Sequence, residues 1–160
     1  MPIGARFPAL LARTLAGTKK KLPDAAAGKV ALIVVAFVRS AQEMIDSWVL
    51  PFEEEFYQSA HVVVYEVPMI ESLLWRPARA MIDGGMRSGI PPGKHDYVIT
   101  WYGNASPYRE ALGMEDRSLA YLFLLDRDGV IRWEGKGFAD SNGVAVLLNT
   151  VKALLHPGSG

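Results

Sequence analysis

The chain has 160 residues, about the length of one domain. Its 17 basic and 17 acidic side chains give a formal net charge of zero, so no overall field attracts nucleic acid or an anionic membrane surface. Half of the residues are hydrophobic, which excludes a wholly disordered chain, and cysteine is absent. The chain therefore holds no disulfide, thiolate-ligated metal, iron–sulfur cluster or cysteine nucleophile.

The first part of the chain, residues 1–29, is expected to form an N-terminal extension. Within it, residues 14–22 have the pattern of a short β-hairpin, with Gly17 at the turn and Leu15 and Leu22 facing inward. The segment is basic and free of acids up to residue 23, as mitochondrial transit peptides are. Proline and glycine interrupt a helix there and serine is missing before residue 23, so we expect neither a transit peptide nor a secretory signal.

The core, residues 30–155, begins with a strand and a helix. Residues 30–38 form an apolar run, typical of a buried strand and shorter than the roughly 20 residues of a membrane-spanning helix. Ser40 and Glu43 then have the Ser-x-x-Glu spacing of a capping box. Apolar residues at helical spacing predict a helix of about 16 residues, kinked at Pro51. Its inward positions are Ala41, Met44, Ile45, Trp48, Val49, Phe52 and Phe56.

Strands and helices alternate through the rest of the chain. The predicted elements are a strand at 61–67 ended by Pro68, a partly helical segment at 70–87, a strand at 97–102, a short helix near 107–112 ending at Gly113, a buried strand at 119–125, a turn at 126–129, a returning strand at 130–134 and a helix at 141–155. Residues 156–160 are expected to form a frayed tail. No repeat or interdomain linker interrupts this order.

This order resembles the thioredoxin-like fold. It predicts one domain over residues 1–160, of the α/β class: three layers, α/β/α, with a mixed central sheet and an N-terminal β-hairpin extension as in peroxiredoxins. Redox members of that fold carry cysteines at the start of the first core helix, where residues 42–46 have none. The loop at 116–119 also lacks the proline that thioredoxins place there. A domain without thiol chemistry is therefore expected.

A set of short motifs occurs in order between about residues 30 and 140. The segments are 47–48, 51–52, 55–56, 71–72, 90–91, 95–96, 109–110, 112–113, Tyr121 and, most distinctive, Leu125-Asp126 followed by Ile131-Arg132-Trp133-x-Gly135-x-Gly137-x-Ala139. Together they resemble the family of the tenth mitochondrial ATPase assembly factor, which helps to install a membrane-sector subunit of F-type ATP synthase. The resemblance implies a redox-inactive domain whose partner is a protein, such as that membrane-sector subunit. It also implies a mitochondrial protein associated with the inner membrane in a eukaryote, and a cytoplasmic one in a prokaryote.

The expected function is therefore a binding or assembly module without a cofactor, and not an enzyme. Two alternatives stay open. One is a general peptide-binding or chaperone-like domain with another partner. Adjacency of its gene to ATP synthase genes would argue against this alternative. The other is an oxidoreductase of the peroxiredoxin or thioredoxin type, which the missing cysteine disfavours.

Candidate partner-binding residues lie between the second and third strands, in a segment longer than the dozen or so residues that a crossover needs. This segment combines tryptophan and methionine with arginine, a composition favoured at adaptable binding surfaces. A covering helix accounts for half of it equally well. The candidate residues are Trp75, Arg76, Arg79, Met81, Met86 and Arg87.

Three further candidates are His95, Asp96 and Arg132. His95 beside Asp96 has the pairing of a general base, but without a placed nucleophile a histidine that binds loop backbone is the simpler interpretation. The histidines have no metal-binding spacing, so no metal site is expected. On a regular strand Trp133 shares a face with Ile131, and Arg132 points the other way. An internal ion pair for Arg132 is favoured over a partner contact.

Two charge runs and two glycines have structural explanations. The lysines at 19–21 predict a solvated turn, and the glutamates at 53–55 predict the solvated face of the first core helix. Gly135 and Gly137 are expected to allow a tight exit from the strand with positive φ angles. None of these features requires a ligand.

Overall fold

The computed structural model of the chain describes residues 3–71, 85–86 and 92–156. Within these ranges the strands form one mixed sheet in the order β2-β1-β5-β4-β3-β6-β7. The strands are β1 (Leu10–Thr14), β2 (Lys19–Leu22), β3 (Val30–Ala36), β4 (Val62–Ile70), β5 (Ile99–Tyr102), β6 (Tyr121–Leu125) and β7 (Ile131–Lys136). The helices are α1 (Gln42–Phe56), α3 (Ser106–Leu112) and α4 (Ser141–Leu155), with short 3-10 helices η1 (Asp24–Ala26), η2 (Arg39–Ala41) and η4 (Pro92–Tyr97). The predicted α/β class and mixed sheet are confirmed.

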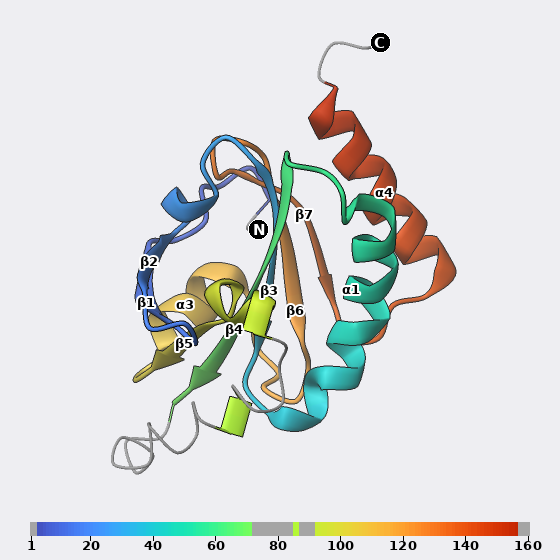
Figure 1. The fold of residues 1–160 in the computed structure, drawn as a ribbon. Coiled ribbons are helices and arrows are strands. Elements are labelled where there is room, and N and C mark those ends of the chain that lie inside the picture. Colours follow the sequence, from blue (N-terminus) through green and yellow to red (C-terminus); the bar gives the residue numbers. More distant parts are fainter. Residues whose placement is uncertain (1–2, 72–84, 87–91, 157–160) are drawn as a thin grey trace.

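The N-terminal hairpin forms as predicted, with Gly17 at its turn at a φ of +88°. Its first strand starts earlier than predicted, because Leu10 pairs with Leu22. Strand β1 also pairs antiparallel with β5, which joins the hairpin to the sheet. Figure 1 shows β1, β2 and α3 on one side of the central strands, and α1 and α4 on the other side. The sheet is therefore covered on both faces.

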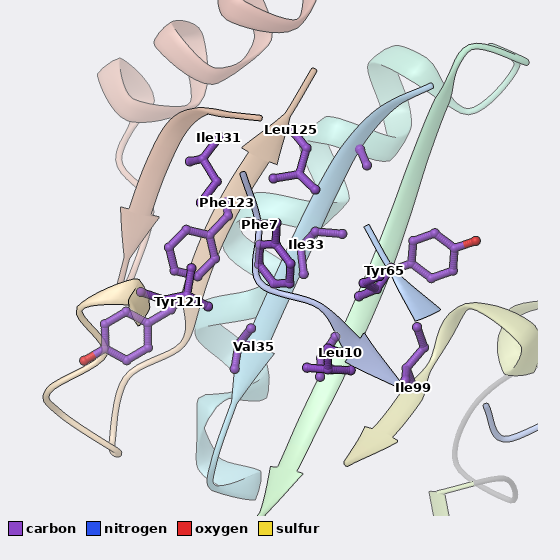
Figure 2. Close-up of a cluster of buried hydrophobic side chains, with 14 of the residues drawn as sticks. Phe7, Leu10, Ile33, Val35, Tyr65, Ile99, Tyr121, Phe123, Leu125 and Ile131 are labelled. Carbon is purple, nitrogen blue, oxygen red and sulfur yellow. The ribbon is translucent and has the colours of Figure 1, made fainter. Parts of the chain in front are cut away.

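Strand β3 lies in the middle of the sheet, parallel to β4 and antiparallel to β6. Its side chains alternate between two buried clusters, as a strand covered on both faces requires. The first cluster fills the space under the hairpin and α3, and Figure 2 shows its members Phe7, Leu10, Ile33, Val35, Tyr65, Ile99, Tyr121, Phe123, Leu125 and Ile131. The second cluster lies under α1 and α4 and includes Leu32, Val34, Trp48, Phe52, Leu122, Leu124, Leu147 and Val151. These clusters make up the core.

The start of α1 differs from the prediction. Ser40 lies in the 3-10 turn η2, and α1 begins at Gln42 with Ala41 as its N-cap and no capping side chain. The capping box of Ser40 and Glu43 is therefore wrong, because the 3-10 turn already supplies a backbone hydrogen bond from Gln42 to Arg39. The predicted inward face of the helix is confirmed by the burial of Ala41, Ile45, Trp48, Val49 and Phe52.

Strand β4 continues past Pro68, so the prediction that this proline ends the strand is wrong. Pro68 is the last residue that pairs with β3, opposite Ala36. On its other side it lies between the bridge of Glu66 to Val98 and the pairing with β5 that begins at Met69. Its missing N–H therefore falls at the end of one ladder and in an interruption of the other, a position that tolerates proline. Ile70, predicted to begin a helical segment, is the last residue of the strand.

The hairpin of β6 and β7 also corrects a prediction. Leu124 lies opposite Trp133 and Leu125 lies opposite Ile131, so Arg132 is the extra residue of a β-bulge. A bulge reverses the alternation of side chains beyond it. Trp133 therefore joins the cluster under α1 and α4 while Ile131 joins the cluster under the hairpin, and the prediction that both share one face is wrong.

The strand predicted at 97–102 begins later, at Ile99, because Tyr97 is the last residue of η4. Most of the partly helical segment predicted at 70–87 lies outside the described residues. The last two helices and β6 agree with the prediction. Helix α3 ends at Gly113, whose φ of +69° and N–H donated to the carbonyl of Arg109 make it a left-handed C-cap. Every residue of β6 is buried, as predicted for a strand covered on both faces. Helix α4 ends at Leu155 with Leu147 and Val151 fully buried.

Candidate functional site

The first turn of α1 carries no group suited to thiol chemistry. Its residues 42–46 read Gln-Glu-Met-Ile-Asp, and the amide of Gln42 donates to the Asp46 carboxylate over 2.9 Å. Within the ranges that the structure describes, no three His, Asp or Glu side chains gather in an arrangement that suits a metal ion. The described residues at this end of the helix therefore form neither a thiol site nor a metal site.

One flank of α1 is fixed to β7 and to the loop that follows it. The indole N–H of Trp48 donates to the carbonyl oxygen of Gly137 over 2.8 Å, and its ring meets that of Trp133 edge to face at 5.2 Å. The neighbouring Ser47 hydroxyl accepts the N–H of Ala139 over 2.9 Å. The first and last of the short motifs in the sequence, at 47–48 and 137–139, are therefore in direct contact.

Two glycines give these rings room. A Cβ on Gly135 would lie 2.5 Å from the Trp133 ring, and one on Gly143 would lie 2.9 Å from the Trp48 ring. The predicted positive φ is present at Gly137, at +69°, whereas Gly135 has none. Gly135 is therefore explained by the close approach of an aromatic ring. We refer to Trp48, Trp133, Gly135 and Gly143 as the tryptophan joint.

The opposite flank of α1 borders a groove. A cavity of about 1240 Å³ lies between α1 and the neighbouring strand β4, and its lining extends from Gln42 to Phe56, the two ends of the helix. Lys94 and Tyr97 of η4 and the described residue Met86 also line it. We refer to this cavity as the α1–β4 groove.

The floor of the groove is one face of β4. On β3 the side chains of Val30, Leu32 and Val34, which face α1, are at most 1% exposed. Every second residue of β4 faces the same side, yet each is only half-buried. These residues are Val62, Val64, Glu66, Pro68 and Ile70. Helix α1 therefore covers β3 more fully than it covers β4.

The helix contributes a second stripe of side chains to the groove. Asp46, Leu50, Glu53 and Tyr57 recur at intervals of three and four residues and all line the groove. Leu50 is 62% exposed and Tyr57 is 75% exposed, although both are large and apolar or amphipathic. Such side chains beside an incompletely covered strand are typical of an interaction surface.

Glu66 is the titratable group on the floor of the groove. Burial raises the pKa of its carboxyl, the neighbouring Asp46 and Glu53 raise it further, and Lys94 opposes them. The Lys94 ammonium is itself paired with Glu53 at 3.0 Å. No described residue donates a hydrogen bond to Glu66 or forms an ion pair with it.

The structure places only some of the predicted partner-binding residues. Met86 lines the α1–β4 groove, and His95 lies in η4, half-buried, at the same side of the molecule. Five candidates lie outside the described residues: Trp75, Arg76, Arg79, Met81 and Arg87. The groove therefore includes one end of the predicted segment.

Asp96 belongs to an internal contact. The ammonium of Lys20 donates to the Asp96 carboxylate over 2.9 Å and lies 5.2 Å and 5.0 Å from the ring centroids of Tyr65 and Tyr97. Burial opposes the charge of Lys20, but the hydrogen bonds to Asp96 and Tyr65 outweigh it and raise its pKa. The prediction of a solvated turn is therefore wrong for Lys20, whose side chain is 18% exposed, because it anchors the hairpin to η4.

Arg132 forms the internal ion pair favoured by the sequence, with its Nε 2.8 Å from the Asp126 carboxylate. Burial opposes the charge of Asp126, but this bond and the N–H groups of Val130 and Asp128 prevail and lower its pKa. The contact closes the turn between β6 and β7. Arg132 does not line the α1–β4 groove.

Leu50, Tyr57 and Glu66 escaped the sequence analysis. Leu50 and Tyr57 fall outside the core-facing positions of the helix. Large apolar or aromatic residues off the buried face require another explanation, so their positions in the sequence already indicated a second surface. Glu66 interrupts an apolar strand, which is equally visible in the sequence. Their grouping depends on how α1 lies over β4, which no local pattern reveals.

The sequence is similar to that of a known protein family. The family model described as ATP10 protein matches residues 4–154. The chain is 24% identical over 153 residues to the mitochondrial ATPase complex subunit ATP10 of Eremothecium gossypii, covering 92% of this chain and 56% of that protein. It thus spans about half the length of that curated relative.

Solved structures share the fold. A disulfide isomerase-like protein of Bacteroides thetaiotaomicron is 16% identical with a TM-score of 0.65, covering 98% of this chain and 91% of its own. The thioredoxin domain of a thiol-disulfide oxidoreductase from Bacteroides vulgatus gives 16% and 0.65, with 94% and 99% covered. BsSco, of the Sco family of cytochrome c oxidase assembly proteins, gives 14% and 0.62, with 98% and 96% covered. The predicted thioredoxin-like fold is confirmed.

Proposed function

The chain belongs to the ATP10 protein family, and from this premise we propose that it is a binding module in the assembly of an ATP synthase, not an enzyme. The family match over residues 4–154, in a chain without cysteine, is the observation that carries the proposal. The relative from Eremothecium gossypii is named as a subunit of the mitochondrial ATPase complex, which supports a partner in the same complex. Without cysteine the chain cannot perform the thiol chemistry of redox thioredoxins, which supports an action through binding.

The proposed partner is a membrane-sector subunit of the ATP synthase. None of the helices that the structure describes combines the length and hydropathy needed to cross a membrane. The module would meet its partner at the inner membrane of a mitochondrion, or from the cytoplasm in a prokaryote. The α1–β4 groove, with its exposed Leu50 and Tyr57, supports binding of a protein segment.

Affinity capture from the source organism tests this function. We expect the tagged full chain to enrich a membrane-sector subunit of the ATP synthase, identified by mass spectrometry, over an unrelated thioredoxin-like domain with the same tag. Adjacency of its gene to ATP synthase genes would support the same conclusion. A reproducible set of partners without any ATP synthase subunit would favour the general peptide-binding alternative.

A second candidate function, thiol-disulfide oxidoreductase, is favoured only by the fold of the solved relatives. We expect the purified chain neither to reduce insulin disulfides nor to consume hydrogen peroxide, because both reactions require a thiolate. Turnover above that of a heat-killed sample would contradict the redox-inactive assignment. A cysteine-containing thioredoxin in the same assay provides the positive control.

A further inference from the structure

The α1–β4 groove has dimensions that suit a helix. It follows α1 along all 15 residues, which at a rise of about 1.5 Å per residue is about 22 Å. Its floor is a face of the sheet, so an occupant contacts side chains and gains no strand pairing. A helical segment satisfies its own backbone hydrogen bonds and is the form that suits an apolar groove.

The walls define the chemistry of that segment. Val62, Val64 and Pro68 on the floor and Leu50 on α1 are apolar, so most of the occupant's contact face is apolar. An occupant that covers the floor removes the Glu66 carboxylate from water. A buried carboxylate without a partner is strongly unfavourable, and one cation on the occupant compensates for it.

Lys94, the described cation that acts on the Glu66 carboxyl, does not meet this need. Lys94 is paired with Glu53, which joins η4 to α1 at the rim of the groove. Both side chains of this pair are partly exposed, and such ion pairs contribute little stability. An occupant can therefore displace the Lys94–Glu53 pair at small cost.

We propose that the α1–β4 groove binds an apolar helical segment of a protein partner that carries one lysine or arginine, and that this cation pairs with Glu66. The inference deepens the proposed function, on which it rests for the partner being a protein. Leu50 and Tyr57 supply the apolar contacts at the rim, and Glu66 selects the segment by its charge. The proposal therefore assigns the specificity of the module to Glu66, a charged residue on an otherwise apolar floor.

Binding of synthetic helices to the purified full chain tests the proposal. The probe is a helical Leu/Ala peptide of about 15 residues with one central lysine and solubilising ends, and its matched peptides carry norleucine or glutamate at that position. We expect titration calorimetry to show at least about tenfold tighter binding of the lysine peptide than of the norleucine peptide. Glu66→Gln should abolish this preference, and Glu66→Lys should transfer it to the glutamate peptide.

Matched variants separate groove binding from general stickiness. Leu50→Ser should weaken the lysine peptide, whereas Leu11→Ser should not, because Leu50 and Leu11 are both 62% exposed and only Leu50 lines the groove. Glu54→Gln, outside the groove, should leave the preference intact. A single cooperative thermal transition shows that each variant is folded.

Several outcomes would overturn the proposal: no binding of any peptide, equal binding of the lysine and norleucine peptides, or a preference that survives Glu66→Gln. Sedimentation that shows a dimer of the chain broken by Leu50→Ser would assign the groove to a second copy instead. The two proposals fail separately. If Glu66→Gln and Leu50→Ser capture an ATP synthase subunit at wild-type levels, the proposed function stands and the groove is rejected as its binding site. If the wild type prefers the lysine peptide but captures no ATP synthase subunit, the groove stands and the proposed function is rejected.

Discussion

The two flanks of helix α1 differ in how completely they are closed. Toward β7, the ring of Trp48 is 5% exposed, its N–H is satisfied by Gly137, and glycines leave room for both rings of the tryptophan joint. Toward β4, Leu50 and Tyr57 are exposed and Glu66 lacks a described partner. The same helix therefore has a fixed side and an incompletely covered side.

This difference separates the residues that stabilise the fold from the residues of the proposed binding surface. The closed flank contains the most distinctive motif residues, so their pattern reports a structural joint between distant parts of the chain. The open flank contains residues that no motif singled out. Changes to the first should alter the free energy of unfolding, and changes to the second should alter binding.

The largest expected effect comes from the closed flank. Trp48→Ala should lower the free energy of unfolding by about 3–5 kcal/mol, because it leaves a cavity between α1, β7 and α4. Tyr57→Ala on the same helix, 75% exposed, should change it by less than about 0.5 kcal/mol. Denaturant melts measure both. Equal effects of the two substitutions would erase the distinction between the flanks.

Gly135→Ala tests the fit of the joint. The added methyl group would lie 2.5 Å from the Trp133 ring and should cost about 1–3 kcal/mol as the ring is displaced. In a Trp133→Leu background the same change should cost almost nothing, since alanine suits a strand at least as well as glycine. The double-mutant cycle in denaturant melts measures this coupling. An additive result would refute the role assigned to Gly135.

The pH dependence of stability tests Glu66 on the open flank. The raised pKa means that the folded state holds the proton more tightly than the unfolded state, so the contribution of Glu66 is present below its ordinary value of 4.5 and is lost as the pH rises through the raised value. Glu66→Gln should therefore melt at a higher temperature than the wild type at pH 7, with the difference shrinking toward pH 4.5.

The described groups that act on the Glu66 carboxyl are Lys94 of η4 and Asp46 and Glu53 of α1. Lys94→Gln should enlarge the effect of Glu66→Gln at neutral pH, because Lys94 is the described cation that opposes the raised pKa. Glu54→Gln is the matched control and should give no pH-dependent difference. A Glu66→Gln variant that melts like the wild type at every pH would show that the carboxyl is well solvated.

The smallest expected effect on stability belongs to the arginines of the crossover, which lie outside the described residues. The triple change of Arg76, Arg79 and Arg87 to serine should shift the melting temperature by only a few degrees, at under about 0.5 kcal/mol per residue. We propose that it also removes the partner recovered by affinity capture. Full retention of the partner by the folded variant would confine the site to other surfaces, with the α1–β4 groove the next candidate.

The elements of the fold followed from local patterns in the sequence. Helical spacing of apolar residues located α1 and α4, continuous apolar runs located β3 and β6, and Gly17 and Gly113 marked a turn and a helix end. These features depend on residues close together in the chain. The absence of cysteine likewise excluded thiol chemistry before any fold was known.

Features that depend on contacts between distant residues needed the tertiary structure. The bulge at Arg132 arises from the register of β7 against β6, and it carried Trp133 to the face opposite the one that regular alternation predicts. The contacts of Lys20 with Tyr65 and Tyr97 and the partial burial of Glu66 depend on β4, η4 and α1, which come together from distant parts of the chain. Local sequence determined which segments are helices and strands, whereas packing between segments decided which side chains are buried, paired or left to bind.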